Sequence, residues 1–253
     1  MLKIFLILLI NLSCAWALSP GQALDSATLV KIDQYRALDQ HISFDLRISS
    51  FKSEKKIDEY TLKGFAGMQS NGKAASLLYF SDPQAVRGRK MLMDDLGIWV
   101  LFPRTRNVIR LSAMQVLLGE VSNGDVARLT FSTHYDAKVV KCEEDGLCEL
   151  LLQVKKNQEG STYSQIKLWV NKKTLLPVKA EFYSTVGGEK LLKTANYSQL
   201  KKISGKDILT VIDMIDGIDP QKRSRMEYLQ MKKHKLPPAS FNKDYLNVWL
   251  PPR

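Results

Sequence analysis

The chain has 253 residues, 45% of them hydrophobic and 25% charged, and its formal net charge is +11. This composition is ordinary for a globular protein with a sizeable core. After the first residues no apolar run approaches the ~20 residues that a membrane-spanning helix needs. The excess of Lys and Arg favours acidic partners such as anionic lipid head groups or lipopolysaccharide, although a lysine-rich surface that only aids solubility explains it equally well.

The first seventeen residues have the pattern of a secretory signal peptide. A positive start through Lys3 precedes an aliphatic run over residues 4–12, and Ala15, Trp16 and Ala17 form a small-x-small cleavage site. We expect cleavage to leave a single exported domain, residues 18–253. For an exported protein nucleic acid is the poorest candidate partner, and we expect peripheral membrane contact at most.

Two other interpretations of the leader are weaker. Its apolar run is short for a permanent membrane anchor. Cys14 raises the alternative of lipid attachment, but Asn11 stands three residues before it, where a leucine is expected. We therefore keep the cleaved signal peptide as the prediction.

The mature chain is predicted to open with a helix and to continue as strands. Pro20 lies near the start of residues 19–38, where apolar residues recur at helical spacing. After that, apolar and polar residues alternate with period two, which is typical of half-buried strands. The strand-like runs are residues 42–48, 60–65, 74–80, 90–94, 98–102, 107–111, 166–170, 178–182, 191–197, 209–215 and 224–231.

Turn signals separate these runs at short intervals. Asn71-Gly72, Gly187-Gly188 and Ser204-Gly205 are examples. About eleven strands in series with short connections predict an antiparallel meander, and therefore a mainly β fold with a minor α part. No linker or low-complexity segment interrupts the chain, so one domain is the economical interpretation.

Residues 112–129 interrupt the series of strands. Ser112 is suited to cap a short helix that carries Met114, Leu117 and Leu118, and Gly119 ends it. A second helical turn is expected after residue 123. Such an insert has to bury its apolar face, and the concave face of the sheet is the available place. It is either part of the core or a lid over a lipid-sized cavity.

Two cysteines remain after the leader is removed. Cys142 and Cys148 flank a segment that contains Asp145-Gly146, a strong tight-turn signal, and aliphatic residues lie on both sides. In an oxidising compartment this spacing predicts a disulfide across a β-hairpin. Metal binding would need more ligands nearby, and a redox pair is normally closer in sequence.

The sequence contains no recognisable catalytic, metal-binding or cofactor-binding motif. His41, His134 and His234 are isolated, and no serine elbow, phosphate loop or dinucleotide-binding glycine pattern is present. Scattered carboxylates leave a glycosidase open, since two acids can come from distant strands. We therefore predict a non-enzymatic protein with no catalytic residue, metal site or cofactor.

Apolar side chains are concentrated around residues 91–131. Methionine is flexible and polarisable, and so suits irregular or exchangeable apolar ligands. Ordinary core packing explains any single one of these residues at least as well. As a hypothesis, an acyl chain is lined by Met91, Met93, Trp99, Leu101, Met114, Leu117 and Leu118, and an anionic head group is met by Arg87, Arg104 and Arg106. Because side chains of a strand alternate, some of these cannot face inward.

Several segments together resemble the LolA-like outer-membrane lipoprotein-sorting proteins, over essentially the whole mature chain. The matching segments are Phe80-Ser81-Asp82-Pro83, Arg87-Gly88, Met91-Leu92-Met93, Trp99-Val100-Leu101-Phe102-Pro103, Arg106-Asn107-Val108-Ile109-Arg110-Leu111, Leu168-Trp169-Val170-Asn171, Leu176-Pro177-Val178-Lys179-Ala180, Leu192-Lys193-Thr194, and Leu236-Pro237 with Phe241 and Leu246.

The resemblance implies a strongly curved antiparallel half-barrel with helices that plug its concave face. It further implies a carrier in the periplasm of a Gram-negative envelope, which binds lipid or lipoprotein acyl chains and transfers them toward the outer membrane. An inner-membrane exporter of the resistance-nodulation-division class is an implied partner. The alternatives are an envelope assembly factor that partners such an exporter, and a cell-envelope hydrolase.

Overall fold

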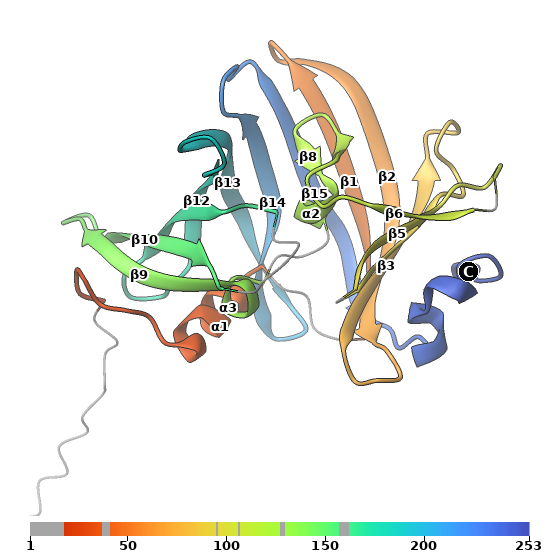
Figure 1. The fold of residues 1–253 in the computed structure, drawn as a ribbon, viewed down its shortest axis with the longest axis horizontal. Coiled ribbons are helices and arrows are strands. Elements are labelled where there is room, and N and C mark those ends of the chain that lie inside the picture. The colour runs from red at the N-terminus through yellow and green to blue at the C-terminus, as the bar shows by residue number, and fades with distance from the viewer. Residues whose placement is uncertain are drawn as a thin grey trace, which may run out of the picture.

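The computed structural model describes residues 18–36, 41–94, 96–105, 107–126, 130–156 and 162–252, and within these residues it is a large curved antiparallel sheet with short helices (Figure 1). The elements are α1 (Ser26–Gln34), β1 (Ile42–Lys52), β2 (Lys55–Met68), β3 (Ala74–Asp82), β4 (Lys90–Asp94), β5 (Gly97–Leu101), β6 (Val108–Leu111), β7 (Val116–Leu118), β8 (Val121–Ser122), α2 (Asn123–Val126), α3 (Phe131–His134), β9 (Tyr135–Cys142), β10 (Leu147–Val154), β11 (Gln165–Asn171), β12 (Pro177–Ser184), β13 (Lys190–Ile203), β14 (Lys206–Asp216), β15 (Lys222–Lys233) and the 3-10 helices η1 (Pro238–Phe241) and η2 (Lys243–Tyr245).

The strand order shows how the chain builds the sheet from two wings. The order is β6-β5-β4-β3-β2-β1-β15-β14-β13-β12-β11-β10-β9, and all neighbouring pairs are antiparallel. The chain runs outward from β1 to β6, crosses to the opposite edge at β9, and returns to pair β15 with β1. The crossing segment is the insert, and Figure 1 shows it lying in front of the curved sheet.

The described part of the sheet has thirteen strands, where the sequence predicts about eleven. The eleven predicted runs all correspond to strands, and the cysteine hairpin adds β9 and β10. The predicted fold class, a mainly β curved sheet that does not close into a barrel, is confirmed.

Side-chain alternation divides the sheet into an inner and an outer face. The inner face carries the main apolar core, in which Ile48, Leu62 and Leu150 are fully buried together with Ile32 of α1 and Val121 of the insert. Both predicted covers, the first helix and the insert, therefore pack against the inner face. This arrangement follows from the need of each element to bury its apolar side.

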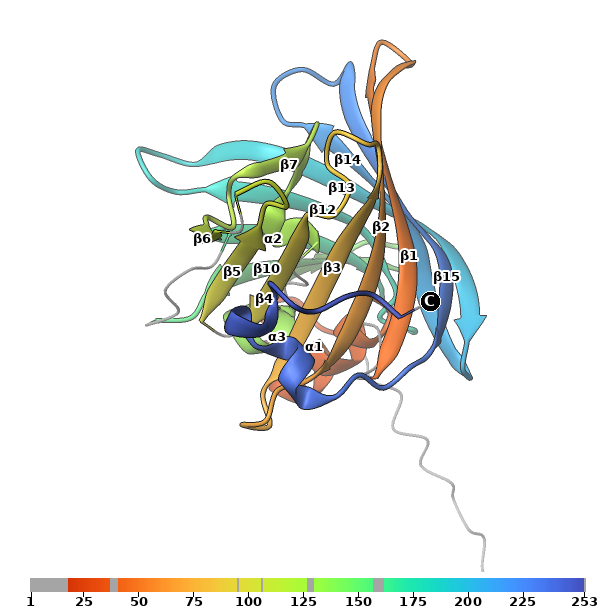
Figure 2. The same ribbon diagram turned by 90° about the vertical axis from the view of Figure 1, so that its right-hand side faces the viewer.

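The outer face of one wing is covered by the C-terminal segment, defined here as residues 236–249 (Figure 2). Phe241 and Trp249 are buried there against Phe65 of β2 and Leu92 of β4. The Lys90 ammonium donates hydrogen bonds to the backbone carbonyls of Leu246, at 2.7 Å, and of Trp249. The segment around Leu236, Phe241 and Leu246, which resembles the closing helix of the LolA-like proteins, contains only the short 3-10 helices η1 and η2 and lies on the outer face of the sheet.

The first helix is shorter than predicted, because it begins at Ser26 and not at residue 19. The Asp25 carboxylate accepts the backbone N–H of Thr28 and so caps the helix start. Residues before it are extended along the edge strand β9: Gly21 and Leu24 donate backbone hydrogen bonds to it, and Ala23 bridges Lys138. The predicted end of the helix, residues 37 and 38, lies outside the described residues.

The first half of the insert is a β-hairpin and not a helix, which corrects the prediction. β7 and β8 pair across a turn in which Gly119 has a φ of +53°. A Cβ at Gly119 would lie 2.3 Å from the Ser224 Oγ and 2.6 Å from the Ser50 Oγ, so the turn needs glycine to lie this close to the sheet. The second helical turn is confirmed as α2, and Leu129 lies outside the described residues.

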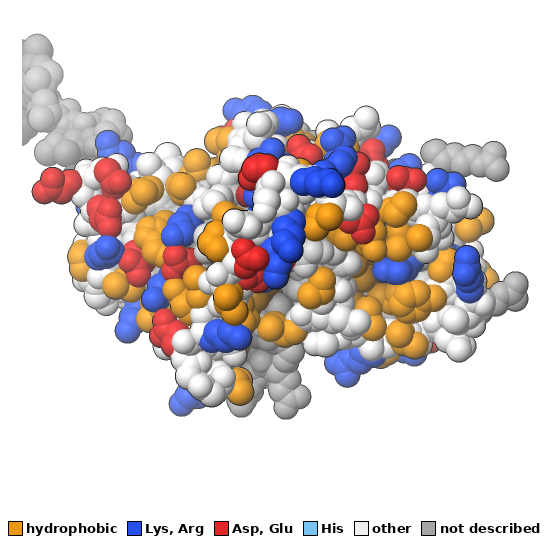
Figure 3. All heavy atoms as spheres, turned by 90° about the horizontal axis from the view of Figure 1, so that it is seen from above, with side chains coloured by type: hydrophobic (Ala, Val, Ile, Leu, Met, Phe, Trp, Pro, Cys, Tyr) orange, Lys and Arg blue, Asp and Glu red, His pale blue; other side chains and the backbone are white. Residues whose placement is uncertain are grey.

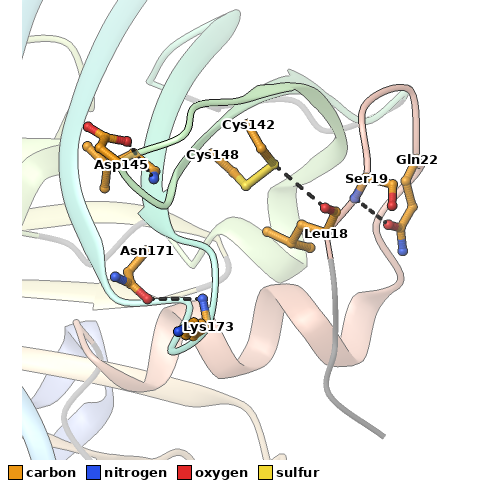
Figure 4. Close-up of a disulfide and its surroundings, with 9 residues drawn as sticks. Leu18, Ser19, Gln22, Cys142, Asp145, Cys148, Asn171 and Lys173 are labelled. Atoms are coloured by element: carbon orange, nitrogen blue, oxygen red, sulfur yellow. Dashed lines mark hydrogen bonds between the residues drawn. A yellow bond between two sulfur atoms is a disulfide. The ribbon is translucent and has the colours of Figure 1, made fainter.

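The predicted disulfide between Cys142 and Cys148 is confirmed, and it joins β9 to β10 next to their turn (Figure 4). The Cys142 Sγ also lies 3.7 Å from the backbone carbonyl oxygen of Leu18. A crosslink over six residues of sequence stabilises the fold by about 2 kcal/mol in the chain-entropy model.

Candidate functional site

A solvent-accessible cleft of about 250 Å³ lies between the β4–β5 hairpin and the insert. Figure 3 looks down on the upper end of the molecule and shows hydrophobic side chains gathered toward the right, the side of β3 to β6, with Lys and Arg side chains among them. The cleft is lined by Arg89, Met91, Val100, Phe102, Leu111, Gln115, Val116, Leu117 and Asn123.

Strand register explains why these residues meet. Met91 of β4 pairs with Val100 of β5, and paired residues of antiparallel strands place their side chains on the same face. That face is the inner one, so the two residues form the floor of the cleft. Leu117 of β7 lies above them and belongs to the same core. Most of the lining is apolar because it is core that the insert leaves incompletely covered, and Arg89, Gln115 and Asn123 are its polar members.

The residues predicted to bind an acyl chain lie in different parts of the structure. Met91 and Leu117 line the cleft, whereas Met93 and Leu118 are buried in the inner core beside it. The exposed side chain of Met114 is not among the lining residues.

The sequence predicted that Trp99 and Leu101 line the cleft, but the structure places both residues on the outer face of the sheet. They pair with Leu92 and Lys90 and pack with the cluster under the C-terminal segment. They therefore cannot line a cleft on the inner face. The residues that replace them are their neighbours Val100 and Phe102.

The insert is anchored to the opposite wing by a buried polar network. The Asp125 carboxylate, whose side chain is 2% exposed, lies 2.8 Å from the Lys193 ammonium of β13. It also accepts hydrogen bonds from the Ser122 hydroxyl and the Tyr163 hydroxyl. Burial raises the pKa of Tyr163, and the neighbouring Asp125 raises it further, so this hydroxyl remains a donor. The Lys193 ammonium also donates to the backbone carbonyl of Glu120.

The cleft contains one basic residue that the sequence interpretation missed, Arg89. Its guanidinium carbon lies 5.2 Å from the centre of the Phe80 ring and 5.0 Å from that of Phe102. The Arg89 Nε is buried and has no hydrogen-bond partner. Burial lowers the pKa of Arg89, because removal of water disfavours the charged form. A signal was present: alternation through Met91 and Met93 puts residue 89 on the same face.

The fold and the cleft can be compared with known proteins. A LolA superfamily protein from Nitrosomonas europaea is 31% identical to this chain, and its structure aligns over 87% of this chain and 97% of its own, with a TM-score of 0.76. The chain belongs to the LolA superfamily. A family model described only as an uncharacterized protein also matches residues 72–248.

Two other solved structures share the LolA-like fold at lower identity. A DUF1329 family protein from Desulfovibrio piger is 23% identical with a TM-score of 0.74, over 87% of this chain and 97% of its own. A domain from Vibrio parahaemolyticus described as an outer membrane lipoprotein-sorting protein is 17% identical with a TM-score of 0.72, over 88% and 97%. A comparison with curated proteins gave no match.

Arg87 and Arg104, two of the three predicted head-group arginines, are not among the residues that line the cleft of this LolA-superfamily protein. The Arg87 guanidinium is exposed, donates to the Ser81 carbonyl and lies 3.3 Å from the Asp82 carboxylate. Arg104 is exposed and not among the lining residues. Arg106 lies outside the described residues. Among the described residues, Arg89 is therefore the basic side chain that the fold brings to the cleft.

The described residues hold no group of three His, Cys, Asp or Glu side chains that could bind a metal ion. Likewise, none of the described helices is both long and apolar enough to cross a bilayer. A second groove, of about 390 Å³, is lined partly by Lys201, Lys202 and Lys232 beside β15. Lys201 and Lys202 are exposed to water, whereas the charge of Arg89 lies among apolar walls.

Proposed function

We propose that this LolA-superfamily protein is a non-enzymatic periplasmic carrier. It holds the acyl chain of a lipid or lipoprotein in the cleft between the β4–β5 hairpin and the insert, and transfers it toward the outer membrane. The observation that carries the proposal is an apolar, solvent-accessible cleft built from the inner core of the sheet. Membership of the LolA superfamily supports it.

The size of the cleft suits part of an acyl chain. A volume of about 250 Å³ equals that of roughly eight water molecules at ~30 Å³ each. About six buried methylenes at ~0.8 kcal/mol each would contribute on the order of 5 kcal/mol to binding. Binding of this strength suits a carrier, because the chain can be released to an acceptor.

The described edges of the sheet favour the carrier over an assembly factor that pairs with partner strands. One edge strand, β6, has only four residues. The other, β9, is already paired in part with residues 21–24. A long free edge, which strand addition to a partner needs, is therefore not offered by these two strands.

Native mass spectrometry of protein purified from its own envelope, followed by lipid extraction, tests the proposal. We expect a bound lipid or acylated peptide with a mass that disappears after delipidation. Protein that carries no lipid, and that also fails to take up a fatty acid in solution, would refute the carrier function. Co-purification with an exporter of the resistance-nodulation-division class would test the proposed hand-off partner.

Two variants locate the binding site. Leu117→Glu places a carboxylate in the apolar lining, and it should stay folded through the Asp125–Lys193 anchor while bound lipid falls at least tenfold. Val116 also lines the cleft but is 65% exposed, so Val116→Trp should narrow the cleft without unfolding the protein. Val186→Trp, at an apolar position that is 87% exposed and outside the cleft, is the matched control. Unchanged lipid content in both cleft variants would place the site elsewhere.

The periplasmic location is part of the proposal. Cell fractionation and N-terminal sequencing of the secreted form test it, and we expect the mature chain to begin near Leu18. A chain that keeps residues 1–17 would contradict cleavage.

A further inference from the structure

Arg89 carries a positive charge in a place where the described residues supply no negative one. Within the described residues no hydrogen bond or ion pair reaches its guanidinium, and its buried Nε has no partner. The rings of Phe80 and Phe102 lie 5.2 Å and 5.0 Å from the guanidinium carbon, and the Tyr60 hydroxyl is close enough to raise the pKa of Arg89 against the effect of burial. These rings offer a weak attraction to a cation, but they accept no hydrogen bond in the plane of the guanidinium.

Such an arrangement is unfavourable in the empty protein. A partly buried cation loses water, and it recovers that loss only if an anion or several acceptors replace the water. Elsewhere in this chain partly buried arginines do have such partners: the Arg225 guanidinium makes two hydrogen bonds, of 2.8 and 2.9 Å, to the Asp213 carboxylate. The Arg36 guanidinium likewise lies over an aromatic ring, that of Phe131, but it has the Asp33 carboxylate at 3.8 Å. Among the described, partly buried arginines, Arg89 is therefore an exception.

The neighbouring arginine shows that exposure alone does not explain Arg89. Arg87, two residues earlier, is exposed and already donates to the Ser81 carbonyl and the Asp82 carboxylate. The residue with access to water thus has its partners inside the protein. The residue that faces the apolar cleft does not.

We propose that the cleft binds an anionic amphiphile with a single inserted chain, whose carboxylate or phosphate is held by Arg89. This inference rests on the proposed carrier function and names its ligand class. The chain lies against Met91, Val100 and Leu117, and the anion meets the guanidinium at the cleft wall. Guanidinium groups bind carboxylate and phosphate through two parallel hydrogen bonds, and the edge that includes Nε supplies two such donors.

The test compares three probes that share a twelve-carbon chain. Laurate and dodecyl phosphate are anionic, and dodecanol is neutral. We expect calorimetric titration of the delipidated protein to give at least ~10-fold tighter binding of an anionic probe than of dodecanol, as a charge-assisted hydrogen bond implies. The better of the two anions identifies a carboxylate or a phosphate as the natural group.

Two variants assign the difference to Arg89. In Arg89→Gln the preference for the anionic probe should fall to less than about threefold, while dodecanol binding stays within a factor of about two. Arg87→Gln is the matched control and should keep the full preference. Arg89→Lys retains charge but loses the paired donors, so an intermediate preference is expected.

A second measurement does not depend on ligand affinity. Removing an unpartnered, partly buried cation should not destabilise the empty protein, so Arg89→Leu is expected to have a thermal midpoint equal to or above that of the wild type. Laurate should raise the midpoint of the wild type and have a much smaller effect on Arg89→Leu.

The outcomes separate this inference from the carrier function. Equal binding of all three probes, or a preference that survives Arg89→Gln, would overturn the role of Arg89 and leave the carrier intact. A destabilised Arg89→Leu variant would overturn it too, because the residue would then be structural. If none of the probes binds to the wild type, this inference fails, and the carrier function fails with it when the purified protein also carries no lipid.

Discussion

The two covers of the sheet use buried cations in different ways. On the outer face the Lys90 ammonium is buried beneath the C-terminal segment and donates to two backbone carbonyls of that segment. The preceding residue, Arg89, lies on the inner face and lines the cleft beside the insert, where its buried Nε has no hydrogen-bond partner. Adjacent residues of one chain therefore have satisfied and unsatisfied charges on opposite sides of the same sheet.

The two covers differ in that the C-terminal segment closes over the outer face, whereas the insert leaves part of the inner face accessible to solvent. The outer cover brings aromatic residues and hydrogen-bond acceptors onto the sheet and leaves a continuous apolar cluster. The inner cover is anchored at one end by Asp125 and Lys193, and at its other end it leaves the cleft. Satisfied buried charges mark where the fold is held together, and the unsatisfied one marks where a ligand is expected.

The largest expected effect is at the inner anchor. Asp125→Ala leaves the Lys193 ammonium buried without its carboxylate and removes the acceptor of the Ser122 and Tyr163 hydroxyls. We expect a loss of about 3–5 kcal/mol in the free energy of unfolding, measured by urea denaturation. The double variant Asp125→Leu with Lys193→Met should recover part of this loss. A single variant within 1 kcal/mol of the wild type would show that the insert is held by its apolar contacts alone.

The outer cover should be less sensitive to a single change. Lys90→Met keeps the aliphatic stem and removes the donor to the Leu246 and Trp249 carbonyls. Hydrogen bonds from a charged group contribute about 1.5–3 kcal/mol, and we expect a loss of that size in urea unfolding. Lys243→Met in the same segment is the control and should change stability by less than about 1 kcal/mol, because Lys243 is exposed. Equal losses in the free energy of unfolding for Lys90→Met and Lys243→Met would contradict a specific role of the Lys90 hydrogen bonds.

The smallest effect concerns pH at the turn of the insert. Burial raises the pKa of Glu120 above its ordinary value of 4.5, and the nearby Asp216 raises it further. A carboxyl group with a raised pKa in the folded state contributes stability below its unfolded pKa and loses it as pH rises through the folded pKa. We therefore expect Glu120→Gln to gain stability relative to the wild type between pH 4 and pH 7, by less than about 1 kcal/mol.

Urea unfolding of both proteins across that pH range measures the difference. A difference that stays constant with pH, or that falls as pH rises, would contradict the assigned environment of Glu120. A constant difference would show that folding does not shift the pKa of Glu120, and a falling difference would show that folding lowers it.

Local patterns were enough to predict most of the architecture. Period-two alternation located the eleven strand runs, because a half-buried strand must alternate whatever its neighbours are. The cysteine spacing predicted the Cys142–Cys148 crosslink for a similarly local reason, since the turn between them brings the two residues together. The helix start failed because Pro20 signals an extended segment as well as a helix, and Asp25 was the actual cap.

The insert and the cleft depended on contacts distant in sequence. Residues 116–118 have apolar side chains that suit a helix or a strand, and only their position over Ser50 and Ser224 requires the tight glycine turn at Gly119. Which face of β5 becomes inner is also decided by the sheet, so Trp99 and Leu101 were assigned to the wrong side. Alternation alone states that two faces exist and cannot say which one is concave.

By itself, the sequence determined a mainly β chain with a hairpin disulfide, because strand periodicity, turns and paired cysteines act over a few residues. The resemblance of particular segments to the LolA-like proteins indicated the family. The tertiary structure decided where the chain crosses the sheet, which side of each strand is covered, and which charge lacks a partner. Those properties arise when residues more than a hundred positions apart in the sequence come into contact, as Lys90 and Trp249 do on the outer face. Arg89 has its significance for the same reason: the cleft around it exists only in the folded chain.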